Sequence, residues 1–235
     1  MQMKTTAKWW DEIEAIVAEK SLLKHAFYRA WTGGELSRAD LAHYARQYYQ
    51  QESRFPRFVS AVHAACPELK VRQALLENLN QEEAGPDNHP ELWLRFAGAV
   101  GVSRKAMASA RADKKTAACV AEFESLCRGE RWQEGLAALY AYESQQPAVA
   151  KTKIQGLKSF YGVESSSALE FFRTHQEADV WHSGVEKKIL REQVAREPGL
   201  AGAVKKAVAR ACDAMNVLLD GVCDARGIPC APSMN

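Results

Sequence analysis

The 235-residue chain has no hydrophobic run that approaches the ~20 residues needed to cross a lipid bilayer. Its N-terminal stretch, MQMKTTAKWWDEIE, turns acidic before any apolar segment develops, so it lacks the pattern of a secretory signal. A strong charge of either sign is also missing. The formal net charge of +2 gives no reason to expect nucleic acid or an anionic membrane as a partner. These absences predict a cytoplasmic protein.

Cysteine pairing patterns are missing as well. The six cysteines include no C-x-x-C pair. Cys119 and Cys127 are eight residues apart, which is neither zinc-ligand spacing nor the framework of a small disulfide-rich domain. We therefore expect free and mostly buried thiols, with Cys230, near the C-terminus, the most exposed of them.

Strand-like alternation, repeats and low-complexity linkers are absent, whereas apolar residues recur with helical spacing from end to end. A first amphipathic segment spans 6–31. A second begins at a capping box of Ser37 and Asp40 and reaches about residue 65, with a kink expected at Pro56. Further helices are expected at 68–83, 90–100, 103–111, 116–128, 132–146, 148–161, 167–193 and 199–225. The pattern predicts one all-α domain over residues 1–235, a bundle of about eight helices.

The stretch HQEADVWH places His175, Asp179 and His182 at positions i, i+4 and i+7. On a helix with ~3.6 residues per turn, these offsets fall at about 0°, 40° and −20°, so the three side chains leave one narrow face. Two imidazoles and a carboxylate on one face suit a metal half-site, although the same pattern also occurs as a polar stripe on a solvated helix.

Three further side chains complete a candidate set of metal ligands. His89 follows the helix-breaking segment GPDN, and Glu82 lies seven residues before it, although the adjacent Glu83 would serve equally well. Glu143 lies in LYAYESQQP, on a helix otherwise rich in Ala, Leu and Tyr, where a buried carboxylate needs a reason such as metal coordination. The candidate ligands are Glu82, His89, Glu143, His175, Asp179 and His182.

The charge of this set suits an oxygen-activating iron pair. Three carboxylates leave two divalent cations with one net positive charge and with open coordination positions. Oxygen and nitrogen ligands do not distinguish Fe/Fe from Mn/Fe, so both stay open.

Three segments, FFRTHQEADVWH, EEAGPDNHPELW and YAYESQQP, resemble the haem-oxygenase-like diiron oxidases, a superfamily that also includes thiaminase-II and pyrroloquinoline-quinone synthase proteins. Within it, the chain is most similar to the family of the Chlamydia protein associating with death domains, over a core of about residues 8–225, which leaves a short C-terminal tail. The resemblance implies an all-helical fold, a metal pair at the same six positions, and a homodimer.

Members of that family are thought to make p-aminobenzoate, a folate precursor, from a tyrosine of their own chain. The resemblance implies that Tyr28, in HAFYRAW, is the consumed tyrosine and that Lys153, in AKTKIQGLKSFYG, donates the amino group. Tyr44 and Tyr142 match family tyrosines that relay electrons or orient the ring. Two iron ions, O₂ and an external reductant would be required, with the electron donor unknown.

The position of Lys153 agrees with such a role. It lies ten residues after Glu143 and beyond Pro147, so a helical hairpin would bring it towards the metals. The neighbouring cations would then lower the pKa of its amine, and Lys151 would point about 200° away.

Other functions remain open at this point. The metals could serve a diiron oxygenase or oxidase that acts on an external small amine or acid. A thiaminase-like hydrolase would need a cysteine nucleophile, and no cysteine lies beside Glu143 or on the 175–182 face. An interaction module without metal is the third possibility, and no basic, acidic or repetitive segment marks a partner surface.

Overall fold

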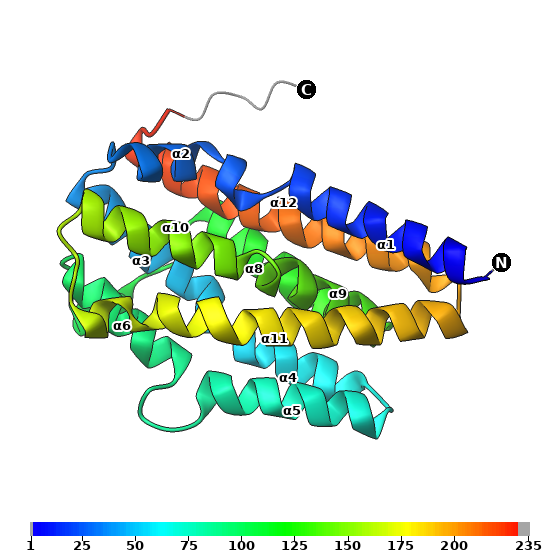
Figure 1. Cartoon of the computed structure of the whole chain (residues 1–235). Helices are drawn as coiled ribbons and strands as arrows, with labels where there is room; N and C mark the ends of the chain where they lie inside the picture. The colour runs from blue at the N-terminus through cyan, green and yellow to red at the C-terminus, as the bar shows by residue number, and fades with distance from the viewer. Residues whose placement is uncertain (1, 230–235) are drawn as a thin grey trace.

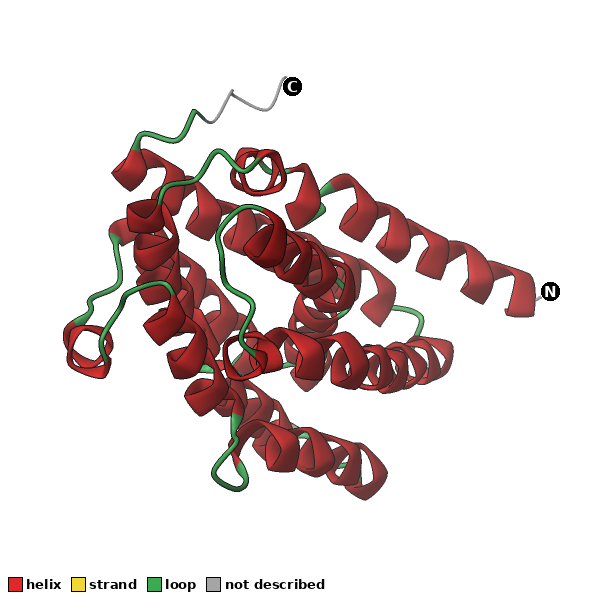
Figure 2. Cartoon of the chain, turned by 60° about the vertical axis from the view of Figure 1, so that its left-hand side comes forward, coloured by secondary structure: helices red, strands yellow, loops and turns green. Residues whose placement is uncertain are grey.

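The computed structural model describes the backbone of residues 2–229 and the side chains of residues 8–229, so Cys230 lies outside the described residues. Every regular element in that range is a helix, which confirms the expected all-α fold (Figure 2). The elements are α1 (Gln2–Glu19), η1 (Leu22–Lys24), α2 (Ala26–Gly33), α3 (Arg38–Glu52), α4 (Phe55–Ala65), α5 (Leu69–Glu83), α6 (His89–Ala99), α7 (Arg104–Ser109), α8 (Lys114–Cys127), α9 (Trp132–Glu143), α10 (Gln146–Ser159), α11 (Ser166–Arg196) and α12 (Leu200–Arg226).

Residues 2–229 form twelve α-helices, more than the expected bundle of about eight. Two of the ten expected helical segments are each divided. The segment expected over 6–31 is interrupted where the His25 ring nitrogen accepts a hydrogen bond from the backbone N–H of Phe27 and so caps α2. The expected kink at Pro56 is a full break between α3 and α4. Proline lacks an N–H and therefore fits the first turn of a helix, where it lies in α4. The capping box of Ser37 and Asp40 is confirmed.

The long helix α11 buries one face in the bundle and exposes another, which carries Val180 and Trp181. It packs against α6, α9 and α10, with α5 on a further side. Figure 1 shows it in yellow, running between α9 and α10 above and α4 and α5 below. The other long helix, α12, packs against α8 and α9 and is covered by α1. The buried face of α11 includes polar side chains, which need partners inside the bundle.

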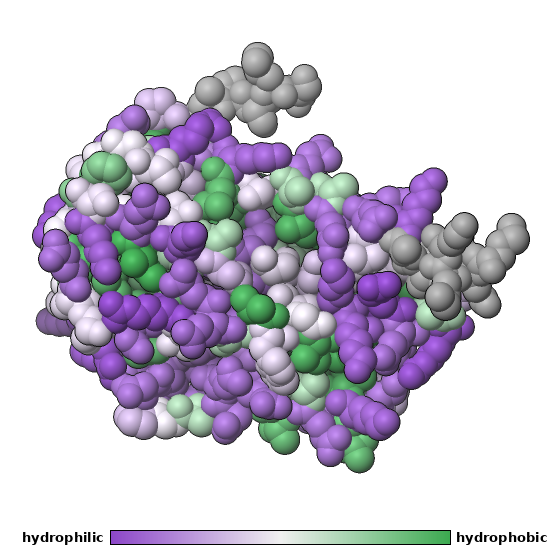
Figure 3. All heavy atoms as spheres, in the orientation of Figure 1, coloured by the Kyte–Doolittle hydropathy of each residue, from purple (hydrophilic) through white to green (hydrophobic). Residues whose placement is uncertain are grey.

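The helices, the surface and the cysteine side chains have the properties that the amino-acid composition predicts. None of the helices within residues 2–229 is long and apolar enough to cross a membrane. The face shown in Figure 3 is largely polar, with apolar side chains scattered over it. The cysteines among the described residues form no disulfide and are buried, as expected. The single-domain organisation, the homodimer and the cytoplasmic location stay predictions.

Candidate metal centre

The stripe predicted on α11 faces the protein interior. His175, Asp179 and His182 are each at most 2% exposed. Asp179 lies between the two imidazoles: its Oδ2 is 2.8 Å from His175 Nδ1 and its Oδ1 is 3.5 Å from His182 Nδ1. The stripe is therefore not an ordinary solvated face.

Glu143 joins this stripe from the last residue of α9. Its Oε1 lies 3.1 Å from His182 Nδ1 and accepts a hydrogen bond of 2.9 Å from the side-chain amide of Asn78. Glu143, Asp179 and His182 each offer a ligand atom, and these three atoms lie within 4.8 Å of one another. This second triad has the size and the donor types of a metal site.

A first triad consists of Glu52, His89 and His175, again with ligand atoms within 4.8 Å of one another. His175 Nε2 lies 3.8 Å from Glu52 Oε1, and the rings of His89 and His175 are 4.5 Å apart. The sequence interpretation missed Glu52, the last residue of α3. Its only local signal is that it follows Tyr48 by four residues, which places it on the same helix face as a buried phenol.

Glu82 lies beside the first triad. It belongs to neither triad and instead contacts the first one, with its Oε1 2.9 Å from His89 Nδ1. Glu82 is fully buried at the end of α5, whereas Glu83 is exposed. The geometry thus favours Glu82 over Glu83 as the carboxylate beside His89.

The centre holds buried polar atoms that the described residues leave without a hydrogen-bond partner. They include both carboxylate oxygens of Glu82, Glu52 Oε1, Glu143 Oε2, Asp179 Oδ1, His175 Nε2 and both ring nitrogens of His182. Burying such groups unpaired is costly, and several carboxylates gathered in one place also repel one another. Two cations bound by oxygen and nitrogen donors would remove both costs, so these residues fit an iron pair.

The same groups shift one another's pKa. Burial raises the pKa of the Glu52 and Glu143 carboxyls. Burial also opposes the charged form of His175, but the carboxylate of Asp179 outweighs it and raises the pKa of His175 to about 9. For His182 the nearby carboxylates of Asp179 and Glu143 outweigh burial and raise the pKa to about 10. Because metals bind deprotonated ligands, a cation at either triad would displace these protons.

A chain of phenols leads away from the first triad. Tyr142 Oη donates a 2.7 Å hydrogen bond to Glu52 Oε2 and lies 2.8 Å from Tyr48 Oη. Gln146 donates to Tyr48 over 3.1 Å. An ionised carboxylate only accepts, so Tyr142 donates to Glu52 and Tyr48 donates to Tyr142. Tyr142, predicted near the site, therefore contacts it directly, and Tyr48, which the sequence interpretation missed, extends the chain.

The remaining predicted residues lie at the far end of this chain. The rings of Tyr44 and Tyr48 are 5.4 Å apart, and the buried hydroxyl of Tyr28 lies beside that of Tyr44. The amine of Lys153 lies 4.5 Å from the Tyr48 ring centre, 5.3 Å from that of Tyr44 and 6.0 Å from that of Tyr28. Tyr28, Tyr44 and Lys153 thus form one cluster in contact with the phenols.

Lys153 has the lowered pKa that was expected. Burial among aromatic rings, at 1% exposure, lowers the pKa of its amine to about 7. The carboxylate of Glu52 acts in the opposite direction and raises this pKa. Lys151, on the same helix, is exposed, as its 200° offset predicts.

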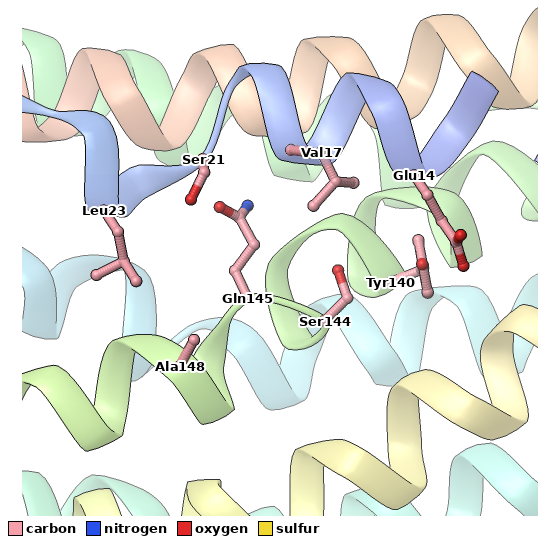
Figure 4. A pocket seen from close by; sticks show the side chains of 9 residues that line it. Glu14, Val17, Ser21, Leu23, Tyr140, Ser144, Gln145 and Ala148 are labelled. Atoms are coloured by element: carbon pink, nitrogen blue, oxygen red, sulfur yellow. The ribbon is translucent and has the colours of Figure 1, made fainter. Parts of the chain in front are cut away.

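A separate pocket of about 240 Å³ lies between α1, η1 and the junction of α9 with α10 (Figure 4). Glu14, Tyr140, Ser144 and Gln145 point towards it from opposite sides. None of the predicted site residues lines it. Gln145 accepts a hydrogen bond from the backbone N–H of Leu22, so this region holds η1 against the bundle.

The chain resembles proteins of known family over most of its length. A family model described as iron-containing redox enzyme matches residues 42–216, a range that includes both triads. The chain belongs to the iron-containing redox enzymes. The enzyme is also similar to proteins named 4-aminobenzoate synthase. One from Nitrosomonas europaea is 41% identical over 90% of this chain and 89% of its own. One from Chlamydia muridarum is 41% identical over 80% of this chain and 79% of its own.

Solved structures with low sequence identity share the fold of the enzyme. A TenA homologue from Pseudomonas syringae has a TM-score of 0.79 at 15% identity and covers 93% of this chain and 92% of its own. A CADD-like protein from Nostoc punctiforme has a TM-score of 0.77 at 18% identity and covers 96% and 100%. A Shewanella denitrificans domain described as having a heme oxygenase-like fold has a TM-score of 0.74 at 16% identity, covering 97% and 94%. The expected haem-oxygenase-like fold is confirmed.

Removing one imidazole from either triad should remove metal. We expect His175→Ala and His182→Ala, purified with iron present, each to retain less than about half of the wild-type iron, because each takes a nitrogen donor from a three-residue site. Iron content measured by mass spectrometry and helicity measured by circular dichroism check this. His63→Ala, at the half-buried end of α4, is the control and should keep its iron. Full iron in both site variants would contradict the assignment.

Proposed function

We propose that this enzyme makes p-aminobenzoate from its own Tyr28, with Lys153 as the amino donor and with an iron pair, O₂ and an external reductant. The main support is the position of Tyr28 relative to Lys153. Tyr28 on α2 and Lys153 on α10 meet in the closed interior, each only 1% exposed, with the amine 6.0 Å from the tyrosine ring centre. The names of the relatives from Nitrosomonas europaea and Chlamydia muridarum support the same product.

The atoms of substrate and product support an internal tyrosine. The side chain of tyrosine is a phenol ring that carries one further carbon, Cβ. p-Aminobenzoate is a ring that carries one carboxyl carbon, with nitrogen in place of the phenol oxygen. Cleavage of the Cα–Cβ bond, oxidation of Cβ to a carboxylate and exchange of oxygen for nitrogen convert one into the other. The polypeptide would keep a glycine at position 28.

The phenols give Tyr28 a connection to the metal centre. When bound, the iron pair supplies, with O₂ and reductant, the oxidising power that these steps need. Tyr142 and Tyr48 form a hydrogen-bonded line to Glu52, and Tyr44 lies between Tyr48 and Tyr28. A phenol that loses an electron must also release its proton. For Tyr48 and Tyr142, the hydrogen bonds that lead to Glu52 offer that proton an acceptor.

Burial prepares Lys153 to act as the nitrogen donor. With a pKa of about 7, a substantial share of its amine is neutral near neutral pH, and only the neutral amine has a free electron pair. The aromatic rings of Tyr44, Tyr48, Trp93 and Phe172 lie 4.5 to 5.5 Å from it and exclude water. The amine therefore meets the oxidised ring with little competition from water.

Isotopic labelling separates this function from action on an external substrate. Protein grown on ring-labelled tyrosine is given unlabelled free tyrosine, iron, reductant and O₂. Labelled p-aminobenzoate should form at less than one equivalent per chain, because the substrate is part of the chain. In the reverse arrangement, unlabelled protein with labelled free tyrosine should yield unlabelled product. Product from the free tyrosine, or many turnovers per chain, would instead identify an oxygenase with an external substrate.

A further inference from the structure

One buried carboxylate beside the metal centre has no part in the site described so far. Glu186 follows His182 by four residues, Asp179 by seven and His175 by eleven. On a helix these offsets place it at about 20° from His175, inside the stripe of α11 rather than at its edge. It is 3% exposed, and neither of its carboxylate oxygens has a hydrogen-bond partner among the described residues.

The neighbour of Glu186 is a member of the second triad. Glu143 uses one oxygen for the hydrogen bond from Asn78, while its other oxygen has no hydrogen-bond partner among the described residues. The Glu186 carboxyl lies near that of Glu143. Asn78, His182 and Glu186 also line one small cavity between α5 and α11, with room for about one water-sized particle. The buried oxygens of Glu143 and Glu186 that lack a hydrogen-bond partner would be satisfied by a cation held between the two side chains.

We propose that Glu186 is a further ligand of the metal at the second triad, so that Glu143 and Glu186 hold one cation between them. The inference rests on the metal pair of the proposed function and not on the identity of the product. In the present geometry Glu186 lies outside the compact triad, and rotation of its flexible side chain would bring it to the cation.

This ligand would make the two metal positions chemically different. The second position would have three carboxylates and one imidazole, from Glu143, Asp179, Glu186 and His182. Around the first position lie the carboxylates of Glu52 and Glu82 and the imidazoles of His89 and His175. Carboxylate oxygens suit hard cations such as Mn²⁺, whereas imidazole suits a broader range of metals. We therefore expect Mn²⁺ to bind more tightly at the second position.

The test measures Mn²⁺ binding to the purified protein without O₂, by electron paramagnetic resonance of the free ion. Glu186→Gln keeps the shape of the side chain and removes its charge. It should weaken one of the two sites by at least about tenfold and leave the other unchanged, since loss of a neighbouring carboxylate already costs about 10–100-fold in known metal sites. Glu192→Gln, an exposed glutamate on the same helix, is the matched control and should bind as the wild type does.

Wild-type affinity at both sites in a folded Glu186→Gln variant would overturn the inference, and Glu186 would then only share a proton with Glu143. If this variant does not fold, a crystal structure of the Mn²⁺-loaded wild type decides. A Glu186 oxygen in contact with the ion supports the inference, and an oxygen that contacts only Glu143 overturns it. Neither result bears on the labelled-tyrosine experiment, which tests the product.

Discussion

Replacing Tyr28 by phenylalanine should reduce p-aminobenzoate formation by at least about 100-fold, because a group that takes part directly in proton transfer at a reacting centre contributes about 10²–10⁴-fold. The phenol oxygen activates the ring for oxidation, and without it the ring cannot lose an electron together with a proton. Metal binding should persist, since Tyr28 contacts Tyr44 and Lys153 and belongs to neither triad. Liquid chromatography of the product and iron analysis of the variant check both parts.

Two further expected results distinguish Tyr28 from other sources of the product. In the wild type, the peptide that carries HAFYRAW should lose the mass of the tyrosine side chain after reaction with iron, reductant and O₂. Tyr140→Phe, a buried tyrosine on α9 outside the phenol chain, should form product as the wild type does. Normal product from Tyr28→Phe, or an unchanged peptide mass after product has formed, would contradict an internal source.

Replacing Lys153 by methionine should abolish product and at the same time stabilise the fold. The pKa of Lys153 is about 7 in the folded protein, whereas an exposed lysine, as in the unfolded chain, has a pKa of 10.5. Between about pH 7 and pH 10.5 the unfolded chain therefore holds a proton on Lys153 that the folded chain lacks. Protonated Lys153 therefore opposes folding, fully below pH 7 and not at all above about pH 10.5. The shift corresponds to a penalty on the order of 5 kcal/mol at pH 6.

Urea unfolding of Lys153→Met and wild type at pH 6 and pH 9 measures this difference. The gain in free energy of unfolding should be larger at pH 6, and Lys151→Met, at an exposed position on the same helix, should show almost no gain. In the wild type, the initial rate of product formation should rise with pH through about 7, as the amine becomes neutral. A stable, fully active Lys153→Met variant would exclude the lysine as donor.

Local periodicity explains which parts of the site the sequence reveals. The arrangement of His175, Asp179 and His182 follows from helix geometry alone, because positions four and seven residues apart share a face whatever packs against it. Helix geometry also predicts that Lys153 and Lys151 point in nearly opposite directions, and only Lys153 is buried. The caps are equally local, as Ser37 and Asp40 show, since they need only the backbone of the first turn.

What the sequence by itself determined was therefore the helical class, the α11 stripe and the side chains that face inward from each helix. Only the tertiary structure decided which helices meet. It brought Glu52 from α3 to His175, placed Glu82 beside His89 and outside both triads, and set Glu186 against Glu143. It also joined Tyr48 to Tyr142. The physical reason is that helical periodicity fixes the direction of a side chain relative to its own axis, whereas the partner across the interface depends on how the whole bundle packs.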